Sequence, residues 1–141
     1  AGRFIRRFGV YPVHGDALGA RQPVHAGDLA AAALLALDNP RTHGRIFALG
    51  GAETLSYRDM IARIFTVLDQ PPRMINVPGL PQLLALAGAI IPGSELSGDV
   101  ARRMNRGLAF DDGTAAAEFG YAPRRFLAGG REDLFGPDGA S

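Results

Sequence analysis

Apolar residues recur at helical spacing most clearly between residues 57 and 68. They fall at i, i+1, i+4, i+5 and i+8, which is one face of a helix: Met60, Ile61, Ile64, Phe65 and Leu68. Ser56 is a good N-cap, and Asp59 three residues later forms a variant of the capping box. The pattern therefore predicts an amphipathic helix that begins after Ser56 and ends before Pro71.

Two other segments are apolar on nearly every side. Residues 29–37 are all alanine or leucine, follow Asp28 as a favourable N-terminal residue and end before Asn39-Pro40. A helix without a polar face is expected to be buried on more than one side. Residues 80–91 form a second apolar helix, shorter than the roughly 20 residues that span a bilayer. We expect that helix to be buried, with an amphipathic segment at a membrane surface as the alternative.

Short strands alternate with helices along the rest of the chain. The predicted strands are 11–13, 22–25, 45–49 and 73–77, with an extended piece at 108–110. The other predicted helices are 3–8, 97–106, 114–119 after Asp111 or Asp112, and 126–134, followed by a flexible tail at 136–141. This order predicts an α/β fold with a small mixed sheet of short strands and several helices. No strand has the long Val/Ile run of a central parallel strand, so a complete doubly wound domain is not expected.

The composition excludes several kinds of chemistry. The 141 residues contain no cysteine, and all 15 basic residues are arginine. Disulfides, a cysteine nucleophile, Schiff-base chemistry, a Walker-type phosphate loop and a Tyr/Lys catalytic pair are therefore ruled out within this chain. The net charge of +1 argues against a nucleic-acid binder. No signal peptide is recognisable at the start, and we expect a cytoplasmic protein.

Few residues remain as candidates for a functional site. His14, His25 and His43 are isolated and do not have the spacing of metal ligands, so no metal is expected. We expect His25 to be a strand residue with a satisfied ring nitrogen in preference to a catalytic base. Arg21 stands just before a predicted strand that leads into a capped helix, where a guanidinium can bind a phosphate or a carboxylate. A solvent-exposed arginine is the alternative, and residue type alone favours it.

The glycine pattern does not predict a dinucleotide site in this chain. No Gly-x-Gly-x-x-Gly sequence is present, and such a turn is what holds a pyrophosphate against a helix N-terminus. Gly50-Gly51 follows a predicted strand and is interpreted as the turn that ends it. A Ser/His/Asp arrangement stays open, but no Gly-x-Ser-x-Gly turn supports it.

Three segments, in order, resemble a known family. Residues 21–30 resemble the Arg-x-Phe/Tyr/Pro-Val/Ile-His-Val-x-Asp-Leu-Ala stretch of NAD(P)-dependent epimerase/dehydratase proteins, the extended and atypical short-chain dehydrogenase/reductases. Residues 46–60 resemble the Asn-Leu-Gly-Gly region that follows it at similar spacing. Residues 111–126 resemble the closing stretch, which ends in Leu-Gly-Tyr/Trp-x-Pro. Together the three segments span roughly residues 8–128.

The resemblance implies roles for some matching positions. The family arginine at Arg21 helps to hold the substrate diphosphate in nucleotide-sugar members, and Arg102 or Arg103 lies where some members place another phosphate-contacting arginine. Asp28 matches an aspartate that acts mainly as a helix cap. Ala48 and Ala26 depart from the family pattern, which puts nucleotide-sugar specificity in doubt. Residues 23–25 and 80–91 look closer to atypical members, including those similar to a complex I accessory subunit.

The family's cofactor fold and catalytic Tyr/Lys pair come from its N-terminal half. The resemblance therefore implies that residues 1–135 are a C-terminal substrate-binding region, inactive alone, that lacks most of the Rossmann domain. NAD or NADP is implied for the full-length oxidoreductase or isomerase and none for this chain. The expected partners are the missing N-terminal Rossmann domain, a small-molecule substrate such as a nucleotide-sugar, and a second copy in a homodimer. The alternative is a non-catalytic interaction or assembly module derived from the same fold; nothing supports an autonomous small enzyme.

Overall fold

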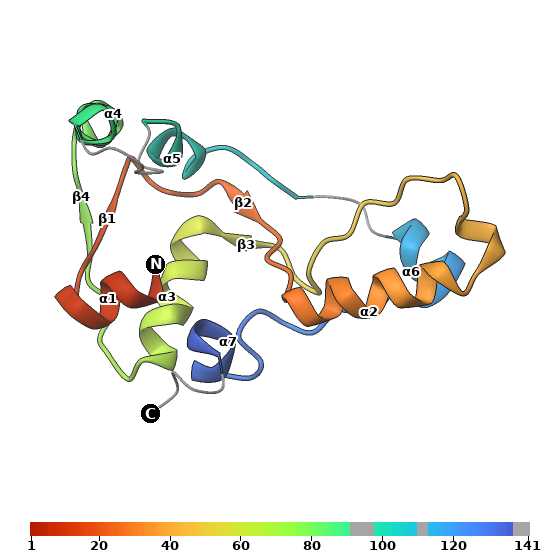
Figure 1. Ribbon diagram of the computed structural model, residues 1–141. Helices are drawn as coiled ribbons and strands as arrows, with labels where there is room; N and C mark the ends of the chain where they lie inside the picture. Colours follow the sequence, from red (N-terminus) through yellow and green to blue (C-terminus); the bar gives the residue numbers. More distant parts are fainter. Residues whose placement is uncertain (91–97, 110–112, 137–141) are drawn as a thin grey trace.

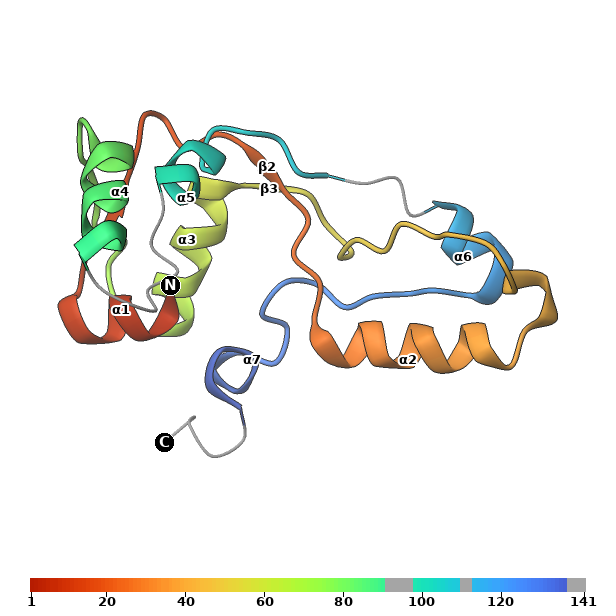
Figure 2. The same ribbon diagram turned by 45° about the horizontal axis from the view of Figure 1, so that its top comes forward.

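The structure, a computed structural model, describes residues 1–90, 98–109 and 113–136. The elements follow one another in this order: α1 (Gly2–Phe8), β1 (Tyr11–Val13), β2 (Ala20–Arg21), α2 (Ala26–Leu37), the 3-10 turn η1 (Pro40–Thr42), β3 (Leu55–Ser56), α3 (Tyr57–Val67), β4 (Met74–Asn76), α4 (Leu80–Ile90), α5 (Gly98–Arg103), α6 (Gly113–Phe119) and α7 (Arg131–Phe135). Helices α1, α3, α4 and α5 gather at one end, and α2 and α6 lie at the other (Figures 1 and 2).

Helix α3 is the centre of the main core and confirms the prediction made for it. The Ser56 hydroxyl accepts a hydrogen bond from the Asp59 N–H at 3.0 Å and donates one to the Asp59 carboxylate at 2.6 Å. This pair satisfies a backbone donor that the first turn would otherwise leave unpaired. The apolar face packs into a cluster of fully or nearly buried side chains: Ile5, Ile61, Ile64, Phe65 and Leu68.

The strands are short and form two separate pairs. β1 and β4 are parallel, with Tyr11 opposite Met74 and Val13 opposite Asn76. β2 and β3 are antiparallel, and Arg21 also forms a parallel bridge to Leu108. The predicted strands at 11–13 and 73–77 are thus confirmed, as is the α/β class with short strands.

Two predicted strands are wrong, and backbone pairing explains both. Residues 22–25 form no strand, because the pairing with β3 ends at Arg21 and the chain turns into α2, with His25 as the N-cap. Pro23 has no N–H to continue a ladder there. Residues 45–49 have the composition of a strand, but no strand lies beside them among the described residues.

The two apolar helices are more exposed than their sequences predict. In α2, Ala32 is buried, but Leu34 is 64% and Leu37 72% exposed. In α4, Leu80 is buried, whereas Leu86 is 61% exposed. Two-sided burial of α2, and burial of α4 over residues 80–86, are therefore wrong in this structure, because leucines on both helices are exposed. The described residues include no helix with both the length and the apolar character needed to cross a membrane.

The C-terminal third follows the predictions in part. Helix α5 is shorter than the predicted 97–106, and α6 ends at Gly120, whose φ of 72° suits a left-handed helix end. The segment predicted as a helix at 126–134 is a series of turns followed by α7. The predicted caps Asp111 and Asp112, Phe110 at the end of the extended piece, and tail residues 137–141 lie outside the described residues.

Candidate functional site

The guanidinium of Arg21 donates hydrogen bonds to backbone carbonyls of the protein itself. Its Nη1 donates hydrogen bonds to the carbonyls of Ala20 and Arg106, and its Nη2 donates one to the carbonyl of Arg103. The guanidinium also lies over the Tyr57 ring, 5.3 Å from its centroid. Burial lowers the pKa of Arg21, the Tyr57 phenol raises it and the charge of Arg103 lowers it further. Arg21 therefore joins β2 to the last residue of α5 and to the residues that follow it.

The backbone just before Arg21 lies very close to that same stretch. Gly19 N–H donates to the Met104 carbonyl at 3.0 Å, and Leu108 N–H donates to the Ala20 carbonyl at 2.8 Å. A Cβ at Gly19 would come within 2.7 Å of the backbone of residues 104 and 106, so this position requires glycine. Arg21 and Arg103 are brought together by this contact, although the sequence separates them by more than 80 residues.

Arg102 and Arg103 occupy the last turn of α5. Arg102 lines a cavity of about 330 Å³ together with His14, Pro81, Gln82 and Ala85. It also pairs with Asp99 at 3.5 Å, but both side chains are about two-thirds exposed, so this pair is weak. We call Arg21, Arg102 and Arg103 the arginine cluster and this hollow the α4 cavity.

His14 is a candidate that the sequence pattern did not single out. It lines the α4 cavity, and its Nδ1 is buried without a hydrogen-bond partner among the described residues. Buried polar atoms are rarely left without a partner, so each one calls for an explanation. Its position just after β1 is the only sequence signal, and an isolated histidine there gave no reason to prefer it.

A pair of tyrosines lies beside the arginine cluster. The hydroxyls of Tyr11 and Tyr57 are 3.0 Å apart. Burial raises the pKa of Tyr57, and the neighbouring Tyr11 raises it further. Tyr57 therefore stays a neutral phenol near neutral pH and does not act as a phenolate base.

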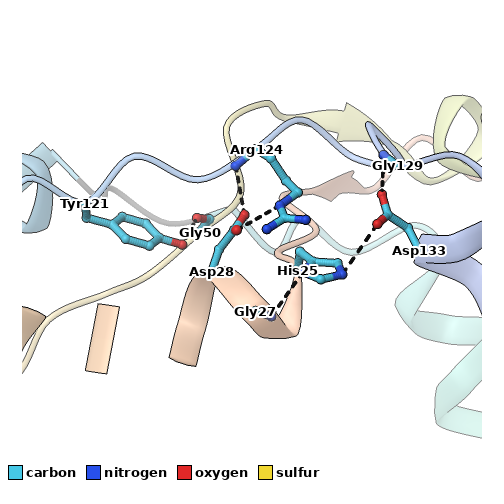
Figure 3. Close-up of polar contacts among 8 residues, drawn as sticks. All are labelled: His25, Gly27, Asp28, Gly50, Tyr121, Arg124, Gly129 and Asp133. Carbon is cyan, nitrogen blue, oxygen red and sulfur yellow. Dashed lines mark hydrogen bonds and ion pairs between the residues drawn. The ribbon is translucent and has the colours of Figure 1, made fainter. Parts of the chain in front are cut away.

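His25 and Asp133 hold the C-terminal segment 121–135, here called the C-terminal strap, against the start of α2 (Figure 3). His25 Nδ1 accepts the Gly27 N–H at 3.0 Å, so its Nε2 faces Asp133, 3.5 Å away. The other Asp133 oxygen accepts the Gly129 N–H at 2.7 Å. Both ring nitrogens are thus engaged, as predicted for one of them, but the residue caps a helix instead of standing on a strand.

Asp28 makes the second contact between α2 and the C-terminal strap (Figure 3). Its carboxylate accepts the backbone N–H of Arg124 at 2.8 Å and the guanidinium Nε–H at 2.9 Å. Burial alone would raise the pKa of Asp28, but these hydrogen bonds and the charges of Arg124 and His25 bring it below its ordinary value. Asp28 lies in the first turn of α2, as the sequence indicates, but the N-cap is His25.

Glu53 anchors the same strap further along. Its carboxylate accepts hydrogen bonds from the Arg63 guanidinium and from the Phe126 N–H, the latter at 3.0 Å. The hydrogen bond from Arg63 lowers the pKa of Glu53 most, against the opposing effect of burial. A cavity of about 200 Å³ remains between the strap and the start of α2.

The turn at Gly50-Gly51 is packed closely against other parts of the protein. A Cβ on Gly51 would come within 1.8 Å of the Pro23 carbonyl oxygen, and the Gly50 carbonyl accepts a hydrogen bond from the Tyr121 hydroxyl at 2.7 Å (Figure 3). The glycines are needed because Gln22 and Pro23 lie where their Cβ atoms would be. Within the part of the chain that the structure describes, no three His, Asp or Glu side chains cluster as metal ligands do.

No family model matches the chain. Among curated proteins, the mitochondrial NADH dehydrogenase [ubiquinone] 1 alpha subcomplex subunit 9 of Arabidopsis thaliana is 28% identical over 76 residues. The match covers 53% of this chain and 19% of that protein.

The structural comparisons cover nearly the whole chain. The NADPH complex of the quinone oxidoreductase QOR2 from Escherichia coli matches 95% of this chain with a TM-score of 0.69 at 19% identity. The dTDP-glucose 4,6-dehydratase of Bacillus anthracis with NAD matches 94% at a TM-score of 0.59 and 16% identity. The UDP-glucuronic acid 4-epimerase of Bacillus cereus with UDP-glucuronic acid and NAD matches 86% at 0.58 and 17%.

The chain shares part of its fold with these oxidoreductase, dehydratase and epimerase structures. The resemblance to the epimerase/dehydratase proteins is therefore confirmed at the level of the fold. The shared fold is represented only in part, because the chain covers 48% of the quinone oxidoreductase, 35% of the dehydratase and 32% of the epimerase.

Proposed function

We propose that residues 1–135 form the substrate-binding part of an NAD(P)-dependent epimerase/dehydratase-like oxidoreductase and have no turnover without a separate nucleotide-binding domain. The observation that carries this proposal is the match of 95% of the chain to less than half of an NADPH-bound oxidoreductase. The absence of a Gly-x-Gly-x-x-Gly turn and of lysine from the sequence supports a cofactor and a catalytic pair supplied from outside these residues.

We infer that the arginine cluster binds an anionic group of the substrate, with a nucleoside diphosphate-sugar as the leading class. Arg102 lines the α4 cavity, and Arg103 leaves the same turn of α5. The guanidinium of Arg21 adds its positive charge to those of Arg102 and Arg103, and its N–H donors that are not bonded to carbonyls have no acceptor among the described residues. Charge-assisted hydrogen bonds from arginine suit phosphate. Two of the similar structures are a UDP-glucuronic acid 4-epimerase with UDP-glucuronic acid bound and a dTDP-glucose 4,6-dehydratase.

A binding experiment tests this proposal. UDP-glucuronic acid is titrated by calorimetry into this chain and into the product of the full coding sequence. Arg102→Gln/Arg103→Gln is expected to weaken binding by about 10- to 100-fold, because each charge-assisted hydrogen bond contributes roughly 1.5–3 kcal/mol before exposure reduces it. Arg6→Gln/Arg7→Gln on α1 is the matched control. Equal affinity of the two double variants, or no binding by the full product, removes the nucleotide-sugar proposal.

A non-catalytic assembly module is the second candidate. Its support is the 28% identity over 76 residues to a subunit of a mitochondrial NADH dehydrogenase subcomplex. Ala26 and Ala48, which depart from the epimerase/dehydratase pattern, favour it as well. An upstream Gly-rich turn with a Tyr-x-x-x-Lys pair favours the enzyme, and so does NAD(P)H turnover by the full product. The two candidates also differ in compartment, with the cytoplasm proposed for the enzyme.

A further inference from the structure

The end of the molecule furthest from α2 carries an unbalanced charge (Figure 1). Residues 1–15 and 70–90, which include α1, β1, β4 and α4, contain four of the 15 arginines and none of the 14 acidic residues. The remainder of the chain is therefore net acidic, although the whole chain has a charge of +1. We call the surface that these four elements form the α1–α4 face.

The arginines of the α1–α4 face are open to solvent. Arg3 and Arg7 are exposed and stand one turn apart on α1, so they share one side of the helix. Arg73, just before β4, is exposed as well. No ion pair within the described part of the chain involves any of these three arginines. Arg6 differs, because its guanidinium lies over the Phe135 ring of α7 at 4.6 Å.

Two phenylalanines lie among the arginines of α1. Phe4 and Phe8 are both exposed, and their ring centroids are 4.7 Å apart. Ile5 of the same helix is fully buried in the main core. Helix α1 is thus anchored through Ile5 and presents arginine and phenylalanine side chains to solvent, which is a composition typical of helices that lie on a membrane surface.

Strand β4 and helix α4 extend the apolar part of this face. A hollow of about 180 Å³ lies between α1 and α4, and its lining includes Phe4, Pro12 and Leu84. Ile75 pairs in register with Pro12, so the two side chains leave the same side of the two-stranded sheet. Ile75 is exposed, as is Leu83 beside Leu84 on α4. In Figure 1, β4 runs along the outer edge of the molecule, between α4 above and α1 below.

The chemistry of the α1–α4 face favours one kind of partner. A second copy of this chain would bring the same arginines against each other, because an isologous dimer pairs a surface with itself. A specific protein interface also needs matched hydrogen bonds, but Asn76 and Gln82 are the only polar side chains in residues 74–90. An anionic membrane needs no such matching. It offers phosphates at the depth of the arginines and acyl chains below them.

We propose that the α1–α4 face binds the surface of a membrane that contains anionic phospholipids. Arg3 and Arg7 meet lipid phosphates. The exposed apolar side chains enter the boundary between headgroups and acyl chains: Phe8, Ile75 and Leu83. The inference goes beyond the proposed function and does not depend on it, because the α1–α4 face contains none of the three arginines of the arginine cluster.

Vesicle sedimentation tests the inference on this chain and on the product of the full coding sequence. Both are expected to bind vesicles of phosphatidylcholine with about 30% phosphatidylserine at least roughly 10-fold more tightly than pure phosphatidylcholine vesicles, and less tightly as salt rises. Arg3→Gln/Arg7→Gln is expected to weaken binding to the mixed vesicles roughly 10- to 30-fold, because each arginine near an anionic surface contributes about 5-fold. Phe8→Asp is expected to weaken it by about 10-fold or more.

Matched variants change the same kinds of side chain outside the α1–α4 face. Arg41→Gln/Arg125→Gln removes two exposed arginines, and Ile46→Asp changes an exposed apolar residue. Both are expected to bind the mixed vesicles as the unchanged protein does. Unaltered urea unfolding shows that Phe8→Asp keeps the fold, and the Arg3→Gln/Arg7→Gln form tests the face without any apolar substitution.

Three results overturn the inference: no binding of the mixed vesicles by the full product, equal binding of both kinds of vesicle, or equal losses in the matched variants. Binding of polyglutamate without binding of vesicles would indicate an acidic protein partner. Dimerisation that Phe8→Asp abolishes, again without vesicle binding, would assign the face to a second copy. The affinity for UDP-glucuronic acid is expected to be the same in the Arg3→Gln/Arg7→Gln form, so a failure of vesicle binding leaves the proposed function standing.

Discussion

Three backbone carbonyls receive N–H groups of Arg21, and the Tyr57 ring lies under its guanidinium. The sequence indicates a cation at this position, but its residue type cannot say whether a phosphate or the protein itself takes the hydrogen bonds. His25 gives the same lesson, because its ring contacts Gly27 and Asp133. For both side chains, contacts with residues more than 80 positions away in the sequence, at 103–106 and at Asp133, could not be read from the local pattern.

Asp28 provides a test at the scale of a single residue. Because its pKa is lower in the folded chain than in the unfolded one, its stabilisation is complete above about pH 5 and is lost as the pH falls below about 4. Asp28→Asn is expected to lower the free energy of unfolding at pH 7 by about 1 kcal/mol, since Arg124 is partly exposed. The difference between the two proteins is expected to shrink at pH 3. Urea unfolding at both pH values measures it.

Asp99→Asn is the matched control for Asp28→Asn. Its partner Arg102 lies 3.5 Å away, and both side chains are mostly exposed. The expected change is below about 0.5 kcal/mol at either pH. An Asp28 effect no larger than the Asp99 effect would mean that the C-terminal strap is not held by this pair.

At the scale of elements, helix α3 and residues 45–49 differ in how much of their structure is local. The N-terminus of α3 is set by Ser56 and Asp59, and one apolar face identifies the side that packs. A strand needs a neighbour to pair with, and no local pattern supplies one. Residues 22–25 and 45–49 therefore have strand composition without a strand, whereas β1 and β4 are strands because they pair with each other.

Ser56→Ala tests the capping box of α3. The substitution is expected to destabilise the chain by about 1 kcal/mol, because the Asp59 N–H loses its acceptor and the carboxylate loses the Ser56 hydroxyl. Thr66→Ala, which removes a hydroxyl hydrogen bond to the Ala62 carbonyl in the last turn, is the control and is expected to change stability by less than about 0.5 kcal/mol. Thermal and urea unfolding measure both, and equal effects would contradict a special role for the cap.

At the scale of the whole molecule, the core is divided. The clusters around α3 and around Val13 share Tyr11, Tyr57 and Met74, whereas the cluster of α2 and α6 is separate. Among the described residues, that third cluster has three buried side chains, Ala32, Ala115 and Tyr121. The α2 end of the described structure therefore buries little apolar surface of its own.

The exposed leucines of α2 predict self-association of this chain. Light scattering is expected to show a mean mass above the monomer that falls on dilution, and Leu34→Glu/Leu37→Glu is expected to restore the monomer. The same two changes at Leu83 and Leu86 of α4 are the control and are expected to have a smaller effect. A monomer at every concentration, or a larger effect of the α4 changes, would contradict the prediction.

The sequence by itself determined the helices with local signals, the positions of the short strands at 11–13 and 73–77, the absence of lysine and cysteine chemistry, and the resemblance that the fold comparisons confirm. Only the tertiary structure decided which face of α2 is covered, that residues 45–49 pair with no strand of the described chain, and that Arg21 meets carbonyls at and just after the end of α5. Helix caps and apolar periodicity act over a few residues and can be read along the chain. Strand pairing, burial and the partners of an arginine depend on residues that are distant in sequence, and the folded chain alone brings those together.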